Sequence, residues 1–149
     1  IWREGTRLYP NQVPADKIKE HLEQFAEIGT VNVDFTGGEP LLRPELGKLY
    51  AHAKDCGFLT TINTNGWFVE RRIEELHNFV DYAQVSLDSP IPEENDYIRG
   101  KRGAHKHAVQ ALKLFKDYSV PVSASVTLTN QTIDRWREYE YQCCFSSAS

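Results

Sequence analysis

The stretch Val31-Asn32-Val33-Asp34-Phe35-Thr36-Gly37-Gly38-Glu39-Pro40 decides the fold of this chain. Apolar and polar residues alternate strictly over 31–35, which predicts a β-strand with two unlike faces. Two glycines and a proline follow, and proline cannot donate to a sheet ladder, so the strand ends and the chain enters a tight loop. The polar residues of that loop are therefore expected at the end of a strand.

The same succession of helix, strand and polar loop recurs on both sides of this stretch. An apolar stripe at Ile18, Leu22 and Phe25 predicts a helix from about residue 14, ended by Gly29. Helices are also expected around 46–53, 73–76 and 108–115, and strands over 58–62, 82–88 and 120–128. A long loop is expected between the strand over 82–88 and the helix around 108–115. Helices and strands that alternate without hairpin signals predict an α/β fold with a parallel sheet.

Composition limits the class of protein. The chain has 149 residues, of which 40% are hydrophobic and 26% charged, the mix of a globular domain with a sizeable core. Its net charge is −4 and no basic run occurs, which argues against nucleic acid or an anionic membrane as partners. No stretch approaches the roughly 20 apolar residues needed to span a bilayer, and no signal peptide is visible, so a cytoplasmic location is expected.

Two counts bear on the extent of the chain and on metals. The sequence contains no Met, so Ile1 is not a translation start and we expect a piece of a longer protein. Cys56, Cys143 and Cys144 have no metal-ligand spacing, so no metal site is predicted. The pattern of helices and strands fades after Asp134, which predicts one domain over 1–134 and an irregular tail over 135–149.

Polar groups gather where the predicted strands end, which is where ligands bind in parallel α/β folds. Gly37-Gly38 allows close approach of the backbone to a ligand, and Glu39 adds a negative charge, a combination that suits an ammonium group. As an isolated tetrapeptide, Gly-Gly-Glu-Pro is equally typical of a simple loop breaker. Arg99 is able to bind a carboxylate through two parallel hydrogen bonds, or is a solvated loop arginine.

The other strand ends leave similar alternatives open. Asn63 and Thr64 close the second strand, while the Asn65-Gly66 pair is typical of a turn. Ser86 is either a hydrogen-bonded core serine or a ligand contact. Asp88 is interpreted as a cap of the loop that follows.

These blocks resemble a known family. Phe35-Thr36-Gly37-Gly38-Glu39-Pro40-Leu41-Leu42-Arg43-Pro44 resembles the signature loop of radical S-adenosylmethionine (radical SAM) enzymes. Residues 62–66, 85–88 and 96–100 resemble further blocks of that family, in the same order. The similarity covers about residues 14–134 and is greatest to the branch of molybdenum-cofactor biosynthesis protein A, the pyrroloquinoline-quinone biosynthesis enzyme and peptide-modifying enzymes with a SPASM extension.

The resemblance implies a partial (β/α)6 TIM-like barrel, here truncated at both ends to about strands two to five. It also implies a [4Fe–4S] cluster held by a Cys-x3-Cys-x2-Cys loop after the first strand, but no cysteine precedes Gly37, so the chain lacks the cluster ligands. The cofactor-binding residues expected by resemblance are Thr36, Gly37, Gly38, Glu39, Asn63, Thr64, Ser86, Arg99 and Asn130.

Within that set, Gly37, Gly38 and Glu39 are expected at the methionyl ammonium of S-adenosylmethionine, and Ser86 and Arg99 near its carboxylate or ribose. The reaction implied is reductive cleavage to methionine and a 5′-deoxyadenosyl radical, which abstracts hydrogen from an unknown small-molecule or peptide substrate, with an electron donor as a further partner. A non-catalytic relative that has lost the cluster is the alternative, and a phosphate-handling barrel enzyme is a third, weaker reading because no phosphate-binding glycine motif occurs.

Overall fold

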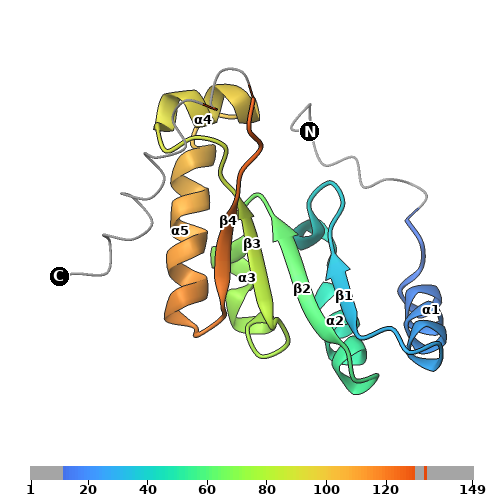
Figure 1. The fold of residues 1–149 in the computed structure, drawn as a ribbon. Coiled ribbons are helices and arrows are strands. Elements are labelled where there is room, and N and C mark those ends of the chain that lie inside the picture. Colours follow the sequence, from blue (N-terminus) through green and yellow to red (C-terminus); the bar gives the residue numbers. More distant parts are fainter. Residues whose placement is uncertain (1–11, 130–132, 134–149) are drawn as a thin grey trace.

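A computed structural model of the chain describes residues 12–129 and residue 133. Helices and strands alternate along it (Figure 1). In chain order the elements are α1 (Ala15–Glu27), β1 (Asn32–Phe35), the 3-10 helix η1 (Pro40–Leu42), α2 (Leu46–Asp55), β2 (Leu59–Thr64), α3 (Val69–Leu76), β3 (Tyr82–Ser86), α4 (Pro92–Arg99), α5 (Ala104–Asp117) and β4 (Val122–Ser125).

The four strands form one parallel sheet in the order β1-β2-β3-β4. Connections between adjacent parallel strands are right-handed, so a sheet whose strands follow chain order carries all its connecting helices on one face. Figure 1 shows α2 and α3 behind the sheet, and α5 packs against β3 and β4. The predicted parallel α/β fold is confirmed, and its layout is that of part of a TIM-like barrel.

The two faces of the sheet differ in chemistry. Ile62, Ala83 and Val85 lie fully buried on the face that the helices cover, together with Tyr50 of α2. The Tyr50 hydroxyl donates to the Thr61 carbonyl oxygen at 2.9 Å and so satisfies its polar end. The alternate residues face away from the helices and are mainly polar: Asn32, Asp34, Thr61, Asn63, Gln84, Ser86, Ser123 and Ser125. In a closed barrel this second face is the interior.

Three boundaries differ from the sequence-based expectations. The expected long loop after β3 contains α4, which begins with proline and two acidic residues and ends at Gly100 in the left-handed conformation. Those are ordinary helix-end signals, but the helix has only eight residues and buries Asn95 rather than an apolar stripe. β2 extends through Thr64 because Asn63 and Thr64 keep pairing with β3, whereas β4 is shorter than predicted and ends at Ser125.

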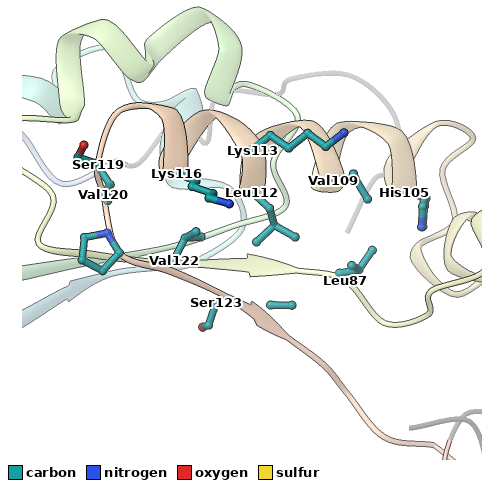
Figure 2. A pocket seen from close by; sticks show the side chains of 12 residues that line it. Leu87, His105, Val109, Leu112, Lys113, Lys116, Ser119, Val120, Val122 and Ser123 are labelled. Carbon is teal, nitrogen blue, oxygen red and sulfur yellow. The ribbon is translucent and has the colours of Figure 1, made fainter. Parts of the chain in front are cut away.

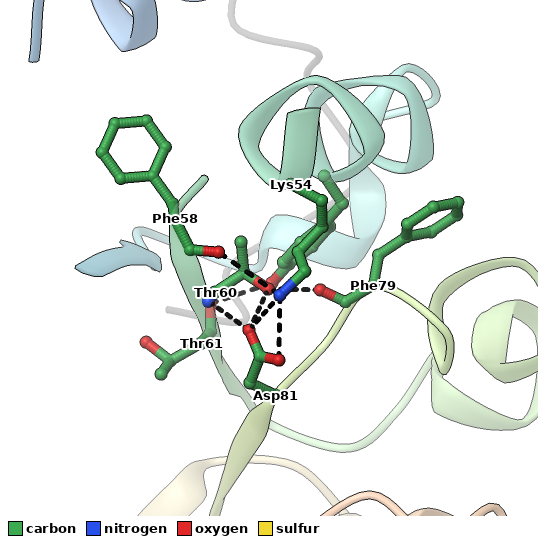
Figure 3. Close-up of polar contacts among 7 residues, drawn as sticks. Lys54, Phe58, Thr60, Thr61, Phe79 and Asp81 are labelled. Carbon is green, nitrogen blue, oxygen red and sulfur yellow. Dashed lines mark hydrogen bonds and ion pairs between the residues drawn. The ribbon is translucent and has the colours of Figure 1, made fainter. Parts of the chain in front are cut away.

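A polar cluster closes the sheet at the end where the strands begin (Figure 3). Lys54 Nζ lies 2.9 and 2.7 Å from the two carboxylate oxygens of Asp81, and Thr60 donates to the same carboxylate from its backbone N–H at 2.7 Å. The Thr60 hydroxyl also donates to the Phe79 carbonyl oxygen. Partial burial acts to raise the pKa of Asp81, but the bonds from Lys54 and Thr60 outweigh burial and hold that pKa below its usual range. This cluster stabilises the fold far from the polar loops.

Candidate functional site

Two hollows in the described part of the chain are candidates for a binding site. The smaller, of about 230 Å³, lies where β1, β2 and β3 end and α4 passes over them. It is lined by Thr36, Gly37, Gly38, Asn63, Thr64, Asn65, Ser86, Asp88, Ile98 and Arg99. The larger, of about 710 Å³, is a groove between α5 and β4 (Figure 2).

The larger groove has little chemistry to offer. Figure 2 shows Leu112, Val122 and Leu87 along it, with Lys113 and Lys116 at its rim. It runs beside β4, which pairs only with β3 among the described strands, so it is the apolar flank of a sheet edge. The smaller hollow combines backbone, hydroxyl, amide and charged groups from several strand ends, as binding sites in this class of fold do. We therefore take the smaller one as the candidate site and call it the strand-end hollow.

The glycine loop after β1 forms one wall of the strand-end hollow. Gly37 has a φ of +132°, a region that residues with a Cβ rarely adopt, so the turn out of β1 requires glycine there. Gly38 has no such backbone requirement, and a Cβ built on it meets no atom within 4 Å. The absence of a side chain at Gly38 therefore keeps space open in the hollow rather than relieving a clash within the protein.

Glu39 is held in place by hydrogen bonds from the protein itself. It does not line the strand-end hollow, and its carboxylate accepts three hydrogen bonds from the protein: from Leu41 N at 3.1 Å, the Thr64 hydroxyl at 2.8 Å and Asn65 N at 2.9 Å. Burial raises the pKa of Glu39 although these bonds act to lower it. The carboxylate thus braces the glycine loop against the end of β2.

The second strand end is a tight turn held from both sides. The Thr64 hydroxyl accepts from Gly66 N at 3.1 Å, and the Asn65 side-chain oxygen accepts from Trp67 N at 2.9 Å, which confirms the turn reading of Asn65-Gly66. Gly66 has a φ of +83°, and a Cβ there would lie 3.0 Å from the Ala108 Cα of α5. α5 therefore packs directly on the turn and fixes its position.

Arg99 is held by a residue that sequence reasoning treated only as a loop cap. Arg99 Nε lies 2.7 Å from Asp88 Oδ2, and Asp88 Oδ1 accepts from the backbone N–H of Thr127 at 2.9 Å. The Asp88 side chain is only 5% exposed, so the pair is well shielded from solvent. It ties α4, the end of β3 and the segment after β4 together. Arg99 also lines the hollow beside this pair.

α4 is anchored to the same strand end by Asn95. The fully buried Asn95 side chain accepts through Oδ1 from Asp88 N at 2.9 Å and from Ser89 N at 3.3 Å. Sequence reasoning missed this residue because a buried asparagine on a short helix leaves no periodic signal. The signal that was available is a different one: an asparagine stands where a helix normally presents an apolar residue to the core.

The structure brings most of the expected site residues together. Thr36, Gly37, Gly38, Asn63, Thr64, Ser86 and Arg99 line the strand-end hollow. Asp88 and Ile98 also line it and were not predicted as site residues. Glu39 lies beside the hollow as a brace, and Asn130 falls outside the described residues. Ser86, for which a core hydrogen bond and a ligand contact were both open, lies on the wall of the hollow.

The described residues do not fit an iron–sulfur cluster. No group of three or more His, Cys, Asp or Glu side chains within 12–129 is arranged to hold a metal ion. Cys56, the cysteine in this range, follows α2 at the opposite end of the sheet from the hollow. None of the helices that the structure describes is long and apolar enough to cross a membrane.

Comparisons with known proteins agree with this geometry. The family model of the Radical SAM superfamily matches residues 2–140. The chain is 31% identical to the Fe-coproporphyrin III synthase of Methanosarcina barkeri over 84% of this chain and 32% of the relative. It is 33% identical to the PqqA peptide cyclase of Streptomyces rochei over 76% of this chain and 32% of the relative.

Among solved structures, Streptococcus suis SuiB superposes with a TM-score of 0.78 at 21% identity, over 91% of this chain and 32% of SuiB. The structure of anSMEcpe with bound AdoMet and a peptide gives a TM-score of 0.72 at 19% identity, over 89% of this chain and 41% of that one. The chain belongs to the Radical SAM superfamily, whose matched members are enzymes. It spans about a third of the length of the curated relatives that it matches.

Proposed function

We propose that the strand-end hollow binds S-adenosylmethionine and that the chain is the cofactor-binding part of a radical SAM catalytic domain. The observation that carries the proposal is the convergence, in one hollow, of an open glycine loop, the half-buried Ser86 and an Arg99 guanidinium held in place by Asp88. These groups come from three strand ends and α4, and together they complement a zwitterionic amino acid joined to a nucleoside.

Each part of the cofactor has a chemically suited group. Gly37 and Gly38 are exposed, and main-chain carbonyls are suitable acceptors for an ammonium group, which donates only. The Arg99 Nη groups suit a carboxylate, and the ion pair with Asp88 limits the rotamers that the guanidinium would lose on binding. The Ser86 hydroxyl and the Asn63 amide suit ribose hydroxyls, which both donate and accept.

Bound S-adenosylmethionine would supply a 5′-deoxyadenosyl radical for hydrogen abstraction in a protein that also provides the cluster ligands. The residues of this chain bind and orient the cofactor and do not carry that electron transfer. Glu39 keeps the glycine loop in register with β2, and Asn95 keeps α4 over the hollow. The uncovered polar face of the sheet leads directly to the hollow and is where a substrate would enter.

Calorimetric titration with S-adenosylmethionine tests the proposal. Gly38→Val should weaken binding by on the order of 2 kcal/mol or more, because its side chain would occupy space that polar groups need in order to pair. Its thermal melt should stay close to that of the parent, since a Cβ at Gly38 meets no atom of the protein within 4 Å. Lys113→Ala, at the rim of the larger groove, is the matched control and should bind like the parent. Equal binding by folded Gly38→Val and by the parent would show that the hollow is not the site.

A further inference from the structure

We propose that Asp34, Thr61 and Asn63 form a recognition site for a lysine or arginine side chain of a peptide substrate. We call these three residues the acceptor patch. They lie on the face of the sheet that the helices leave uncovered, directly next to the strand-end hollow. The proposal rests on the proposed function, because a substrate must lie beside the cofactor.

The patch is an ordered array rather than a loose acidic surface. Asp34 of β1 is the register partner of Thr61 of β2, and Asn63 follows two residues later on the same face. Asp34 Oδ1 accepts from the Thr61 hydroxyl at 2.9 Å, and Oδ2 accepts from Asn63 Nδ2 at 2.7 Å. Both oxygens are therefore fixed by side chains that sit on a neighbouring strand, which is more rigid than a loop.

These two bonds determine what the patch presents to a ligand. An ionised carboxylate only accepts, so Thr61 must donate its single hydroxyl proton to Asp34 and Asn63 must turn its NH2 group toward it. The Thr61 oxygen then offers lone pairs only, and Asn63 offers Oδ1 together with its second amide N–H. Carboxylate, hydroxyl and amide oxygens thus make the patch rich in acceptors, which favours a ligand that supplies N–H or O–H donors.

Among the residues that the structure describes, the charge of the patch is uncompensated. Asp34 is exposed, and none of the ion pairs between described residues includes it. The neighbouring positions on this face of β3 and β4, Gln84 and Ser123, are polar but neutral. Burial raises the pKa of Tyr50 on the other side of the sheet, and the negative charge of Asp34 raises it further. A fixed carboxylate that has no cationic partner within 12–129 and has further acceptors beside it favours an ammonium or guanidinium group.

The position of the patch and the chemistry of the matched relatives select the occupant. Asn63 belongs to both the acceptor patch and the strand-end hollow, so a group bound to the patch lies next to the cofactor site. The relatives include an Fe-coproporphyrin III synthase and a PqqA peptide cyclase. Porphyrin carboxylates would meet like charge and acceptors at the patch, which is unfavourable, whereas a basic peptide side chain is complementary. The geometry therefore points to a peptide.

Backbone amide NMR titration of the chain tests the site without knowledge of the natural substrate. The probes are the capped tripeptides acetyl-Gly-Lys-Gly-amide, its norleucine analogue and its glutamate analogue, with coproporphyrin III as the anionic alternative. S-adenosylmethionine is titrated first, and shifts at Gly37 and Gly38 report the proposed function by themselves. We expect the lysine peptide to shift the amides of Asp34, Thr61 and Asn63 and to bind about tenfold more tightly than the norleucine peptide.

Variants separate the patch from general electrostatics. Asp34→Asn should remove the preference for lysine over norleucine while S-adenosylmethionine still shifts Gly37 and Gly38, and Asp34→Lys should transfer the preference to the glutamate peptide. Asp55→Asn, which neutralises an exposed carboxylate at the end of α2, should behave like the parent. A thermal melt of each variant confirms folding. Equal binding of the lysine and norleucine peptides to the parent, tighter binding of coproporphyrin III at these amides, or an unchanged preference in Asp34→Asn would overturn the proposal.

Discussion

Replacement of Glu39 measures how much one carboxylate contributes to the shape of the site. Its three donors, Leu41 N, the Thr64 hydroxyl and Asn65 N, all point at two oxygens. Glu39→Gln keeps one oxygen and turns an NH2 group toward the remaining donors. If the glutamine oxygen takes the place of Oε1, it still accepts from Leu41 N and from the Thr64 hydroxyl. The NH2 group then takes the place of Oε2, so the Asn65 N–H faces a donor and has no acceptor.

The size of the effect follows from two opposing contributions. An orphaned, shielded N–H costs about 1–3 kcal/mol, while removal of a buried charge returns part of that cost, since burial is what raises the pKa of Glu39. We expect Glu39→Gln to lower the free energy of unfolding by about 1 kcal/mol at neutral pH. Glu39→Ala, which removes all three acceptors, should lower it by about 3 kcal/mol.

Chemical denaturation followed by circular dichroism gives both values, with Glu74→Gln on the exposed side of α3 as the control. The pH dependence supplies a second check. The folded-state pKa of Glu39 is raised above its ordinary 4.5, so the stability contributed by its protonated form is present below that value and is lost as the pH rises through the folded pKa. The advantage of the parent over Glu39→Gln should therefore shrink as the pH rises above 4.5. A Glu39→Gln protein as stable as the parent at every pH would refute the role of Glu39 as a brace.

Three further predictions concern stability. Asn95→Ala leaves the Asp88 and Ser89 N–H groups without their acceptor and should lower the free energy of unfolding by about 2–3 kcal/mol. It should also weaken S-adenosylmethionine binding. Chemical denaturation measures the first effect and calorimetric titration the second. Asp81→Asn should remove an acid-induced loss of stability that the parent shows. The lowered pKa of Asp81 contributes stability that is present above its ordinary value of 3.8 and is lost as the pH falls through the folded-state pKa. Thermal melts of both proteins over a series of acidic pH values test this. Gly47→Ala places a Cβ against Glu75 Oε1, closer than an ordinary contact, so the single variant should change the unfolding free energy by about zero, because the helical gain from alanine is offset by displacing Glu75. Gly47→Ala combined with Glu75→Ala should gain about 1 kcal/mol of unfolding free energy relative to Glu75→Ala alone.

Local patterns in the sequence were enough to predict α1, α2, α3 and α5, the parallel sheet and the polar loops that follow its strands, but not α4 or the ends of β2 and β4. The alternation over 31–35 and the Gly-Gly break appear in the structure as β1 and the loop that follows it. Seven of the expected site residues line one hollow because parallel strands deliver their carboxyl ends to the same edge, a rule that needs only the order of the elements. Backbone periodicity and loop chemistry are short-range properties, so the sequence alone determined them.

Only the tertiary structure decided which side chain meets which. The sequence shows that Glu39 and Asp88 lie near strand ends. It does not show that the Glu39 carboxylate accepts hydrogen bonds from the end of β2 and its turn, or that Asp88 forms an ion pair with Arg99. It shows an Asn-Gly turn, but not that α5 packs on Gly66 at a distance that excludes a side chain. Asp34 becomes an acceptor array only because the register places Thr61 opposite it. Each of these contacts joins residues more than ten positions apart, where pairing depends on how the layers pack rather than on local preference.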